Sequence, residues 1–330
     1  MYQLERIIRG AGSGFARGDI QSLWGCELNA FRDGAQILPS PAPFPAPFNV
    51  VAQNVRLAPV VIEDGGTDNP DIIRVIYGRA DILNIPVQIK GTPSATSVSL
   101  LNTVGIRKND LLLAFESGKE CTIVQATDNL VKVDAEDVVD TLPNPINLGS
   151  GAYNNSATGL SAYSSSGRIV DIGNATESGS RPGFLLFGID NRSQLVSYDL
   201  LNLDDVSPPA SQPIADNIVN LQGAYGIDNN GDNVVDVWAA PVNNFSADSL
   251  SDGSPKAASA LASIKAIRLA IIARSALFER EMVSGQDWSL FSDNATIEVK
   301  GKLTNDERHF RYHVFDVVIP LRNMLLIPNS

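Results

Sequence analysis

The sequence of 330 residues predicts an α+β fold, in which one short N-terminal helix is followed mainly by strands. Apolar residues recur at helical spacing near the start of the chain, whereas the rest alternates short Val-, Ile- and Leu-rich runs with turn residues. Hydrophobic residues make up 44% and charged residues 19%, which is ample material for a buried core and excludes a disordered or collagen-like chain.

The helix is expected over residues 2–9, where Leu4, Ile7 and Ile8 share one face. Three glycines within residues 10–14 then end it. The helix therefore has one apolar face to bury against the rest of the chain.

Residues 38–59 hold six prolines within 39–59, which excludes a helix or a central strand. Two interpretations of this segment stay open: a surface loop packed over the core, or an extended ligand of a recognition domain.

Short strand-like segments follow, with a loop-like stretch rich in Gly, Ser and Asn at 143–183. The expected strands lie within 71–89, 97–101 and 110–133, and within a hairpin over 184–201 that turns at 190–192.

The last third of the sequence predicts a strand over 218–228. It also predicts a helix with Ser254 as its N-cap and Pro255 as its first residue. The run 264–278 fits either a helix or a strand with alternating faces. Residues 310–320 have strand composition and stop at Pro320.

The net charge of the chain narrows the classes of partner that it can bind. The formal net charge of −12 without a basic cluster argues against nucleic acid and anionic lipid as main partners. No apolar run approaches the ~20 residues of a membrane-spanning helix, and the start has no signal-peptide core.

Cys26 and Cys121 are either two separate buried thiols or one disulfide, which an exported chain would favour. A bridge would close a loop that stabilises by ~4–5 kcal/mol at most.

A calcium site is the sharpest local prediction. In the run Asp228 to Asp236, oxygen side chains occupy positions 1, 3, 5 and 9, as at the start of a calcium loop. The side chains of Asp228, Asn230, Asp232 and Asp236 and the carbonyl of Val234 would bind Ca²⁺. Position 12 is not the usual Glu, so affinity would be weak, and the alternative is a plain Asn/Gly turn.

No catalytic constellation is found. The two histidines, His309 and His313, lie four apart in a strand-like run with no acid or cysteine spacing that completes a zinc site. The common hydrolase and phosphate-binding motifs are absent, and the glycines at 10–18 do not fit the dinucleotide pattern. We therefore expect no enzyme.

Four segments resemble one family. QLERIIRGAG (3–12) resembles the second half of the N-terminal helix of pilins, and LQGAYGIDNNGDNVVDVW (221–238) resembles the signature stretch of PilW-type minor pilins. IKAIRLAIIARS (264–275) and RYHVFDVVIPLRN (311–323) are similar to later segments of that family, which is related to the GspJ-like pseudopilins.

The resemblance implies a pilin-like fold, with a truncated N-terminal helix packed on an antiparallel sheet and large β-rich insertions. Residues 1–18 would be the remnant of that helix, 19–217 a β-rich region with long loops, and 218–330 the C-terminal β-rich part with the calcium loop. It also implies a leader and an apolar half-helix ahead of residue 1, which would hold the protein in the inner membrane facing the periplasm.

The function that the resemblance implies is priming of type IV pilus assembly at the pilus tip, supporting adhesion and twitching motility. The implied partners are other minor pilins and a tip adhesin, and no nucleic acid. Two alternatives remain: a tip adhesin module that binds a surface through loops 38–59, 143–183 and 203–216, and a secreted, calcium-stabilised hydrolase.

Overall fold

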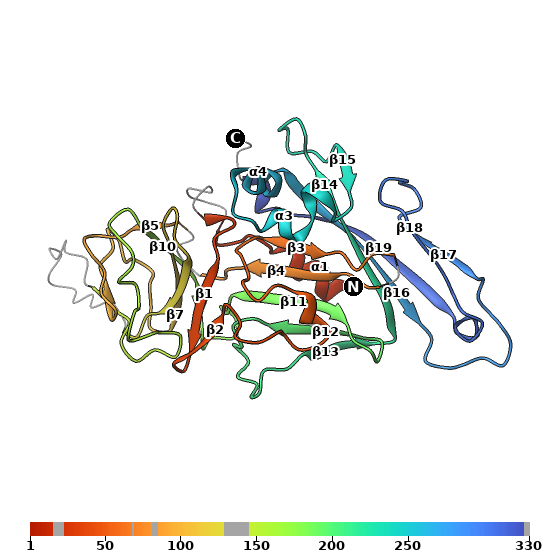
Figure 1. Ribbon diagram of the computed structural model, residues 1–330, viewed down its shortest axis with the longest axis horizontal. Helices are drawn as coiled ribbons and strands as arrows, with labels where there is room; N and C mark the ends of the chain where they lie inside the picture. The colour runs from red at the N-terminus through yellow and green to blue at the C-terminus, as the bar shows by residue number, and fades with distance from the viewer. Residues whose placement is uncertain (16–22, 68, 81–84, 129–144, 327–330) are drawn as a thin grey trace.

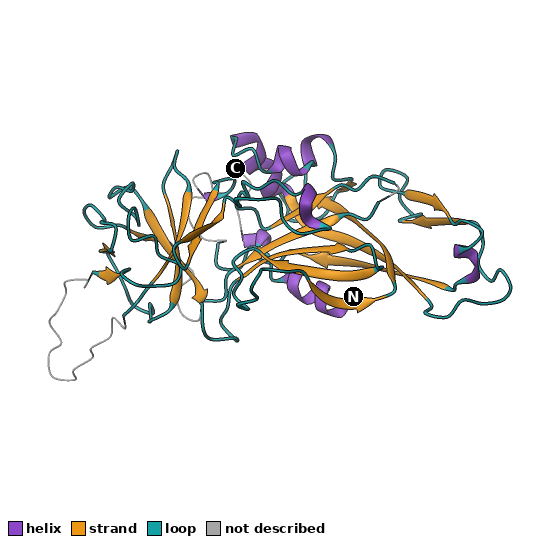
Figure 2. Ribbon diagram, turned by 60° about the horizontal axis from the view of Figure 1, so that its bottom comes forward, coloured by secondary structure: helices purple, strands orange, loops and turns teal. Residues whose placement is uncertain are grey.

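The computed structural model describes residues 1–15, 23–67, 69–80, 85–128 and 145–326. Strands dominate, and the described α-helices have four to nine residues (Figure 2). The expected order of a helix followed by antiparallel strands is confirmed, but the class is mostly β rather than α+β, because the helices are short and few. Parts of four predicted segments, namely 16–18, 81–84, 129–133 and 143–144, lie outside the described residues.

A six-stranded sheet lies at one end of the elongated molecule (Figure 1). One of its faces packs into the main core through Leu111 and Leu113, and the other packs a second cluster through Leu112 and Ala114. Its order is β2 (Ala35–Leu38), β1 (Leu28–Arg32), β8 (Cys121–Gln125), β7 (Asp110–Phe115), β10 (Arg168–Asn174) and β5 (Val87–Gln88). The pair β6 (Ser97–Val98) and β9 (Ile146–Asn147) adds Val98 and Ile146 to the second cluster.

The interpretation of 143–183 as a loop is therefore wrong for two segments. Strand β10 is buried along most of its length and pairs with β7 over Arg168 to Asn174. Its short run RIVDIGN stands between Gly/Ser-rich stretches that mask it in the sequence. Tertiary pairing decides its structure.

The five-stranded sheet occupies the middle of the molecule (Figure 1). It has the order β13 (Gln212–Asp216), β12 (Gln194–Asp199), β11 (Gly183–Ile189), β4 (Ile72–Tyr77) and β3 (Val60–Glu63). The predicted hairpin with its turn at 190–192 is confirmed as β11 and β12. The proline-rich loop packs beside this sheet, where the buried rings of Phe44 and Phe48 contact Tyr198.

The four-stranded sheet consists entirely of residues after 217. Its order is β15 (Val237–Ala239), β14 (Ile218–Ile227), β16 (Ile264–Arg274) and β19 (Tyr312–Pro320). The ambiguous run 264–278 is thus a strand up to Arg274, with Ile267, Leu269 and Ile271 in the main core. The proposed boundaries at residues 18 and 217 stay a prediction.

Helix α1 (Tyr2–Arg9) is confirmed and lies against β19, with Leu4 and Ile8 buried. Helix α4 (Pro255–Ser263) begins where predicted, because Ser254 Oγ accepts a hydrogen bond from the Ala257 N–H. The other short helices among the described residues are α3 (Ala247–Leu250), η1 (Phe48–Val50), η2 (Asn243–Phe245), η3 (Glu307–His309) and η4 (Met324–Leu326). None of the helices in the described part of the chain is long and apolar enough to span a bilayer.

A hairpin of β17 (Asp287–Leu290) and β18 (Val299–Lys302) projects at the other end of the molecule (Figure 1). Leu290, Phe291 and Ile297, at the loop that connects its two strands, form a small core with Ala270 and Ile272 of the four-stranded sheet. The excursion between β16 and β19 is therefore anchored by apolar contacts on the face of the sheet opposite the main core.

Candidate functional site

The loop 228–236 joins β14 to β15, and Asp228 closes it. Asp228 is 3% exposed, and its Oδ1 accepts hydrogen bonds from Gly231 N at 2.6 Å and Asn230 N at 3.1 Å. Its Oδ2 accepts from Asn233 N at 2.9 Å. Gly231 and Asn233 have φ of 85° and 65°, a conformation that these two residue types tolerate best. One buried carboxylate thus organises the turn.

The other predicted calcium ligands also engage groups of the loop. Asp236 accepts from Asn229 N at 2.7 Å and from Asn230 Nδ2 at 3.2 Å, and Asp232 accepts from Val234 N at 2.8 Å. Within the described ranges, no three His, Cys, Asp or Glu side chains gather closely enough to hold a metal ion. The geometry is that of a hydrogen-bonded turn, and calcium binding stays a prediction.

A buried lysine ties this loop to the end of the chain. Lys265 is 2% exposed, and its Nζ donates to Met324 O at 3.4 Å. Burial lowers the pKa of the Lys265 ammonium group, and the negative charge of Asp228 offsets part of that lowering. The charge of Lys265, in β16, therefore interacts with that of Asp228, in the loop, while the same ammonium group contacts the turn near the C-terminus.

Asn323 holds the end of α1. Its Nδ2 donates to Ala11 O at 3.0 Å and to Gly10 O at 3.3 Å. A helix leaves its last carbonyls without intrahelical partners, so an amide at this position satisfies carbonyls just beyond the last turn. Gly12 N donates to Ile76 O at 2.9 Å, which fastens the same turn to β4. The sequence did not predict this role, because the partners are more than 300 residues apart.

Two polar residues link the four-stranded sheet to the five-stranded sheet. Asp71 is 1% exposed and accepts hydrogen bonds from Gly65 N at 2.9 Å and from Gly223 N, in β14, at 2.8 Å. Burial raises the pKa of Asp71 to about 7, although the two N–H donors act in the opposite direction. Tyr225 is fully buried, and its hydroxyl accepts from Ile62 N, in β3, at 2.6 Å.

Arg268 fixes the β17–β18 excursion to the four-stranded sheet. Its guanidinium lies 2.6 Å from Asp316 Oδ2 and 2.7 Å from Asp293 Oδ1, and 5.0 Å from the Phe291 ring. Hydrogen bonds to these two carboxylates raise the pKa of Arg268. One guanidinium thus pairs with two carboxylates on the face of the sheet opposite the main core.

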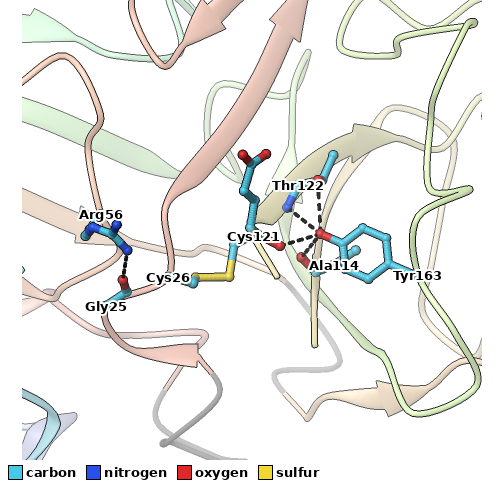
Figure 3. Close-up of a disulfide and its surroundings, with 8 residues drawn as sticks. Gly25, Cys26, Arg56, Ala114, Cys121, Thr122 and Tyr163 are labelled. Carbon is cyan, nitrogen blue, oxygen red and sulfur yellow. Dashed lines mark hydrogen bonds between the residues drawn. A yellow bond between two sulfur atoms is a disulfide. The ribbon is translucent and has the colours of Figure 1, made fainter. Parts of the chain in front are cut away.

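Cys26 and Cys121 are joined in a disulfide, with their Cα atoms 5.7 Å apart (Figure 3). The bond lies where β1 pairs in parallel with β8, since Leu28 is opposite Cys121. Beside it, the Tyr163 hydroxyl contacts Thr122 N and Ala114 O, both at 3.1 Å (Figure 3). The bridge thus closes the N-terminal segment onto the six-stranded sheet.

The two histidines do not share one strand, contrary to the expectation from their spacing. His309 belongs to η3, with Nδ1 2.8 Å from Glu279 O and its ring stacked on Phe278 at 4.5 Å. His313 lies in β19, where its ring is 4.4 Å from that of Phe315. The turn Glu307–His309 ends before the strand begins, which separates the two rings.

The comparisons with known proteins give one family. Residues 189–323 match the family model PilW, described as Type IV Pilus-assembly protein W. The match includes the four-stranded sheet, the loop 228–236, the β17–β18 hairpin and Asn323. No curated protein and no solved structure matches the chain. Over residues 189–323, this chain is therefore similar to the PilW family of type IV pilus-assembly proteins.

Proposed function

We propose that the protein is a minor pilin that primes type IV pilus assembly as part of the complex at the pilus tip. The observation that carries the proposal is the PilW match over 189–323, which contains every strand of the four-stranded sheet. The other minor pilins and a tip adhesin would be its partners, and adhesion and twitching motility would depend on it.

The packing of α1 supports a pilin-like arrangement. Leu4 and Ile8 are buried and α1 contacts β19, whereas Tyr2 at its start is 75% exposed. A helix held on a sheet by one face leaves its N-terminal end free to project from the globular part. In this proposal, an apolar half-helix ahead of Tyr2 holds the precursor in the inner membrane, and the β-rich remainder faces the periplasm.

Two observations on cells test this proposal. The native reading frame upstream of the Tyr2 codon is expected to encode a short basic leader ending in Gly, followed by about twenty apolar residues, the length that a bilayer crossing needs. Immunogold labelling of the protein on intact pili is expected to mark one end of each pilus. Label distributed along the whole fibre would contradict the tip assignment.

A tip adhesin module is the second candidate. It is favoured by a cavity of about 350 Å³ between the β17–β18 hairpin and the four-stranded sheet, lined by residues that include Trp288, Tyr312 and Asn220. The proline-rich loop 38–59 favours it less, because its Phe44 and Phe48 are buried rather than displayed. Binding of the purified chain to cells or abiotic surfaces, without any other pilin, would support the adhesin over the priming role.

A further inference from the structure

The cavity of about 350 Å³ between the four-stranded sheet and the β17–β18 hairpin has an ordered floor. Its floor is a row of three directly opposed residues, Asn220 in β14, Ile272 in β16 and Val314 in β19. Directly opposed residues of antiparallel strands lie on the same face of a sheet, so the whole row faces the hairpin. Pockets for small molecules usually hold roughly 300–1,000 Å³, so this cavity is large enough for one ring of a ligand.

Two aromatic rings line the cavity in fixed positions. Trp288 lies opposite Gly301 in the hairpin, and a Cβ atom at position 301 would lie only 2.1 Å from Trp288 Cζ2. A glycine is therefore required beneath the indole, which lies across the hairpin backbone. The second ring is that of Tyr312, whose hydroxyl donates to Glu307 O at 3.0 Å. Both rings also pack against the small core around Leu290, which keeps them in place.

A buried amide in the floor has a donor group left for a ligand. Asn220 is 7% exposed, and its Oδ1 accepts a hydrogen bond from Gln222 Nε2 at 3.1 Å. Gln222 Nε2 also donates to Asn69 O at 2.9 Å, which fixes the orientation of both amides. Among the residues that the structure describes, none accepts a hydrogen bond from Asn220 Nδ2. A buried donor without a partner is costly, so this group favours a ligand that carries a hydrogen-bond acceptor.

The hairpin adds an acid and a base that are not paired with each other. Asp287 and Lys302 are directly opposite in the hairpin, both are exposed and both line the cavity. In the described part of the chain, no ion pair joins them and neither side chain makes a hydrogen bond. A carboxylate only accepts hydrogen bonds and an ammonium group only donates them. Together they can serve both the hydrogen and the lone pairs of ligand hydroxyls.

The surroundings of the cavity are close to neutral. Residues 264–330, which supply most of its lining, carry nine Lys and Arg against eight Asp and Glu, although the whole chain has a net charge of −12. The second acid in the lining is Glu307, and Arg274 acts electrostatically on the neighbouring Tyr312. An anion or a cation would therefore meet no matching field, so these charges favour a neutral ligand.

We propose that this cavity binds one ring of a neutral saccharide. A sugar ring has a face of C–H groups and a rim of hydroxyls, and the negative face of an indole attracts such C–H groups. The C–H face lies against Trp288, while hydroxyls accept from Asn220 Nδ2 and Lys302 Nζ and donate to Asp287. A purely apolar ligand would leave the Asn220 amide without an acceptor. Saccharide binding is a function beyond the priming of pilus assembly and does not depend on it.

Titration of the purified chain with sugars, followed by NMR, tests this site. The neutral probes are lactose, cellobiose, maltose and N,N′-diacetylchitobiose at millimolar concentration, and the charged probes are sialyllactose and a cationic glucosamine disaccharide. The chain has three tryptophans, so the indole N–H signal of Trp288 is identified by its loss in W288L. At least one neutral probe should shift this signal and the side-chain amide signal of Asn220, with saturation.

Matched variants locate the binding. W288L removes the aromatic face from the cavity, whereas W238L removes a tryptophan that packs against the same small core but lies outside the lining. W288L should weaken binding about tenfold, and W238L should leave the affinity unchanged. D287N changes only an exposed side chain and should also weaken binding about tenfold, whereas D306N, at an exposed acid outside the cavity, should not.

The proposal fails in any of three cases. In the first, no neutral probe shifts the two signals. In the second, a probe binds W288L and D287N with the affinity of the wild type, which places the sugar elsewhere. In the third, a charged probe binds and none of the neutral probes does, which contradicts the selection of a neutral ligand.

The saccharide site and the priming role can fail separately. The titrations use the purified chain and no pilus, so the absence of sugar binding would leave the priming role intact. Normal piliation of a strain that lacks the gene would contradict the priming role and would leave the saccharide site unaffected.

Discussion

We predict that Asp71 makes the stability of this protein depend on pH. Its carboxyl group is 1% exposed and joins two sheets through Gly65 N and Gly223 N. Burial raises its pKa from the ordinary value of 3.8 to about 7. The folded state therefore holds this proton more tightly than the unfolded state, so the stabilisation is fully present below pH 3.8 and is lost as the pH rises through 7.

The magnitude follows from these two pKa values. Linkage between proton binding and folding gives a fall of about 2–3 kcal/mol in the free energy of unfolding between pH 5 and pH 8. The variant D71N keeps the shape of the side chain and one acceptor oxygen but has no proton to release. Its free energy of unfolding should lack this part of the pH dependence.

The assay is urea unfolding of the wild type and of D71N at several pH values from about 5 to 8, followed by fluorescence. Other carboxylates titrate in both proteins, so the difference between the two curves isolates Asp71. The difference is expected to change by about 2–3 kcal/mol in favour of D71N as the pH rises. Parallel curves would refute the assignment of a buried, protonated Asp71 between the sheets.

Removal of the disulfide by C26S/C121S should lower the free energy of unfolding by about 2–4 kcal/mol, measured by urea unfolding, because a closed loop restricts the unfolded chain; an unchanged midpoint would contradict this. Y225F should lower the free energy of unfolding by about 1–3 kcal/mol in the same assay, since it leaves the buried Ile62 N–H without its acceptor. An unchanged free energy of unfolding would contradict the importance of this hydrogen bond. Millimolar Ca²⁺ should raise the melting temperature of the wild type by a few degrees and should leave the melting temperature of D232A unchanged. Equal melting temperatures in Ca²⁺ and in chelator would remove the calcium prediction.

Local signals in the sequence predicted local structure well. Leu4 and Ile8 mark the buried face of α1, and Ser254 caps α4, because these features depend on neighbours within one or two turns. The hairpin at 190–192 follows in the same way from turn residues between two apolar runs. Helix spacing, capping and tight turns are determined over a few residues.

Features that depend on distant partners were not predictable. The run 264–278 has a pattern that suits a helix and a strand equally, and pairing with both β14 and β19 decides for the strand. Asp71 gains its role from Gly223 N, and Asn323 gains its role from Ala11 O, both across more than 150 residues. These contacts arise from the packing of whole sheets, which spacing along the chain does not encode.

The loop 228–236 and the edge strand β19 differ in the same way, because the sequence predicted the first and not the second. The oxygen-rich loop 228–236 was found from its spacing, yet its carboxylates serve backbone N–H groups in the structure. The place of β19 at an edge of the four-stranded sheet was not predicted, because strand composition does not reveal which strand lies at the end of a sheet. Its exposed valines look like core residues until the sheet order is known.

We propose above all that this chain, which matches the PilW family model over residues 189–323, is needed to assemble type IV pili. Deletion of its gene, followed by electron-microscopic counting of surface pili, tests this most directly, with the intact natural gene returned as the control. We predict that the deletion strain has few or no surface pili and that the returned gene restores them. A deletion strain with the normal number of pili would contradict the account.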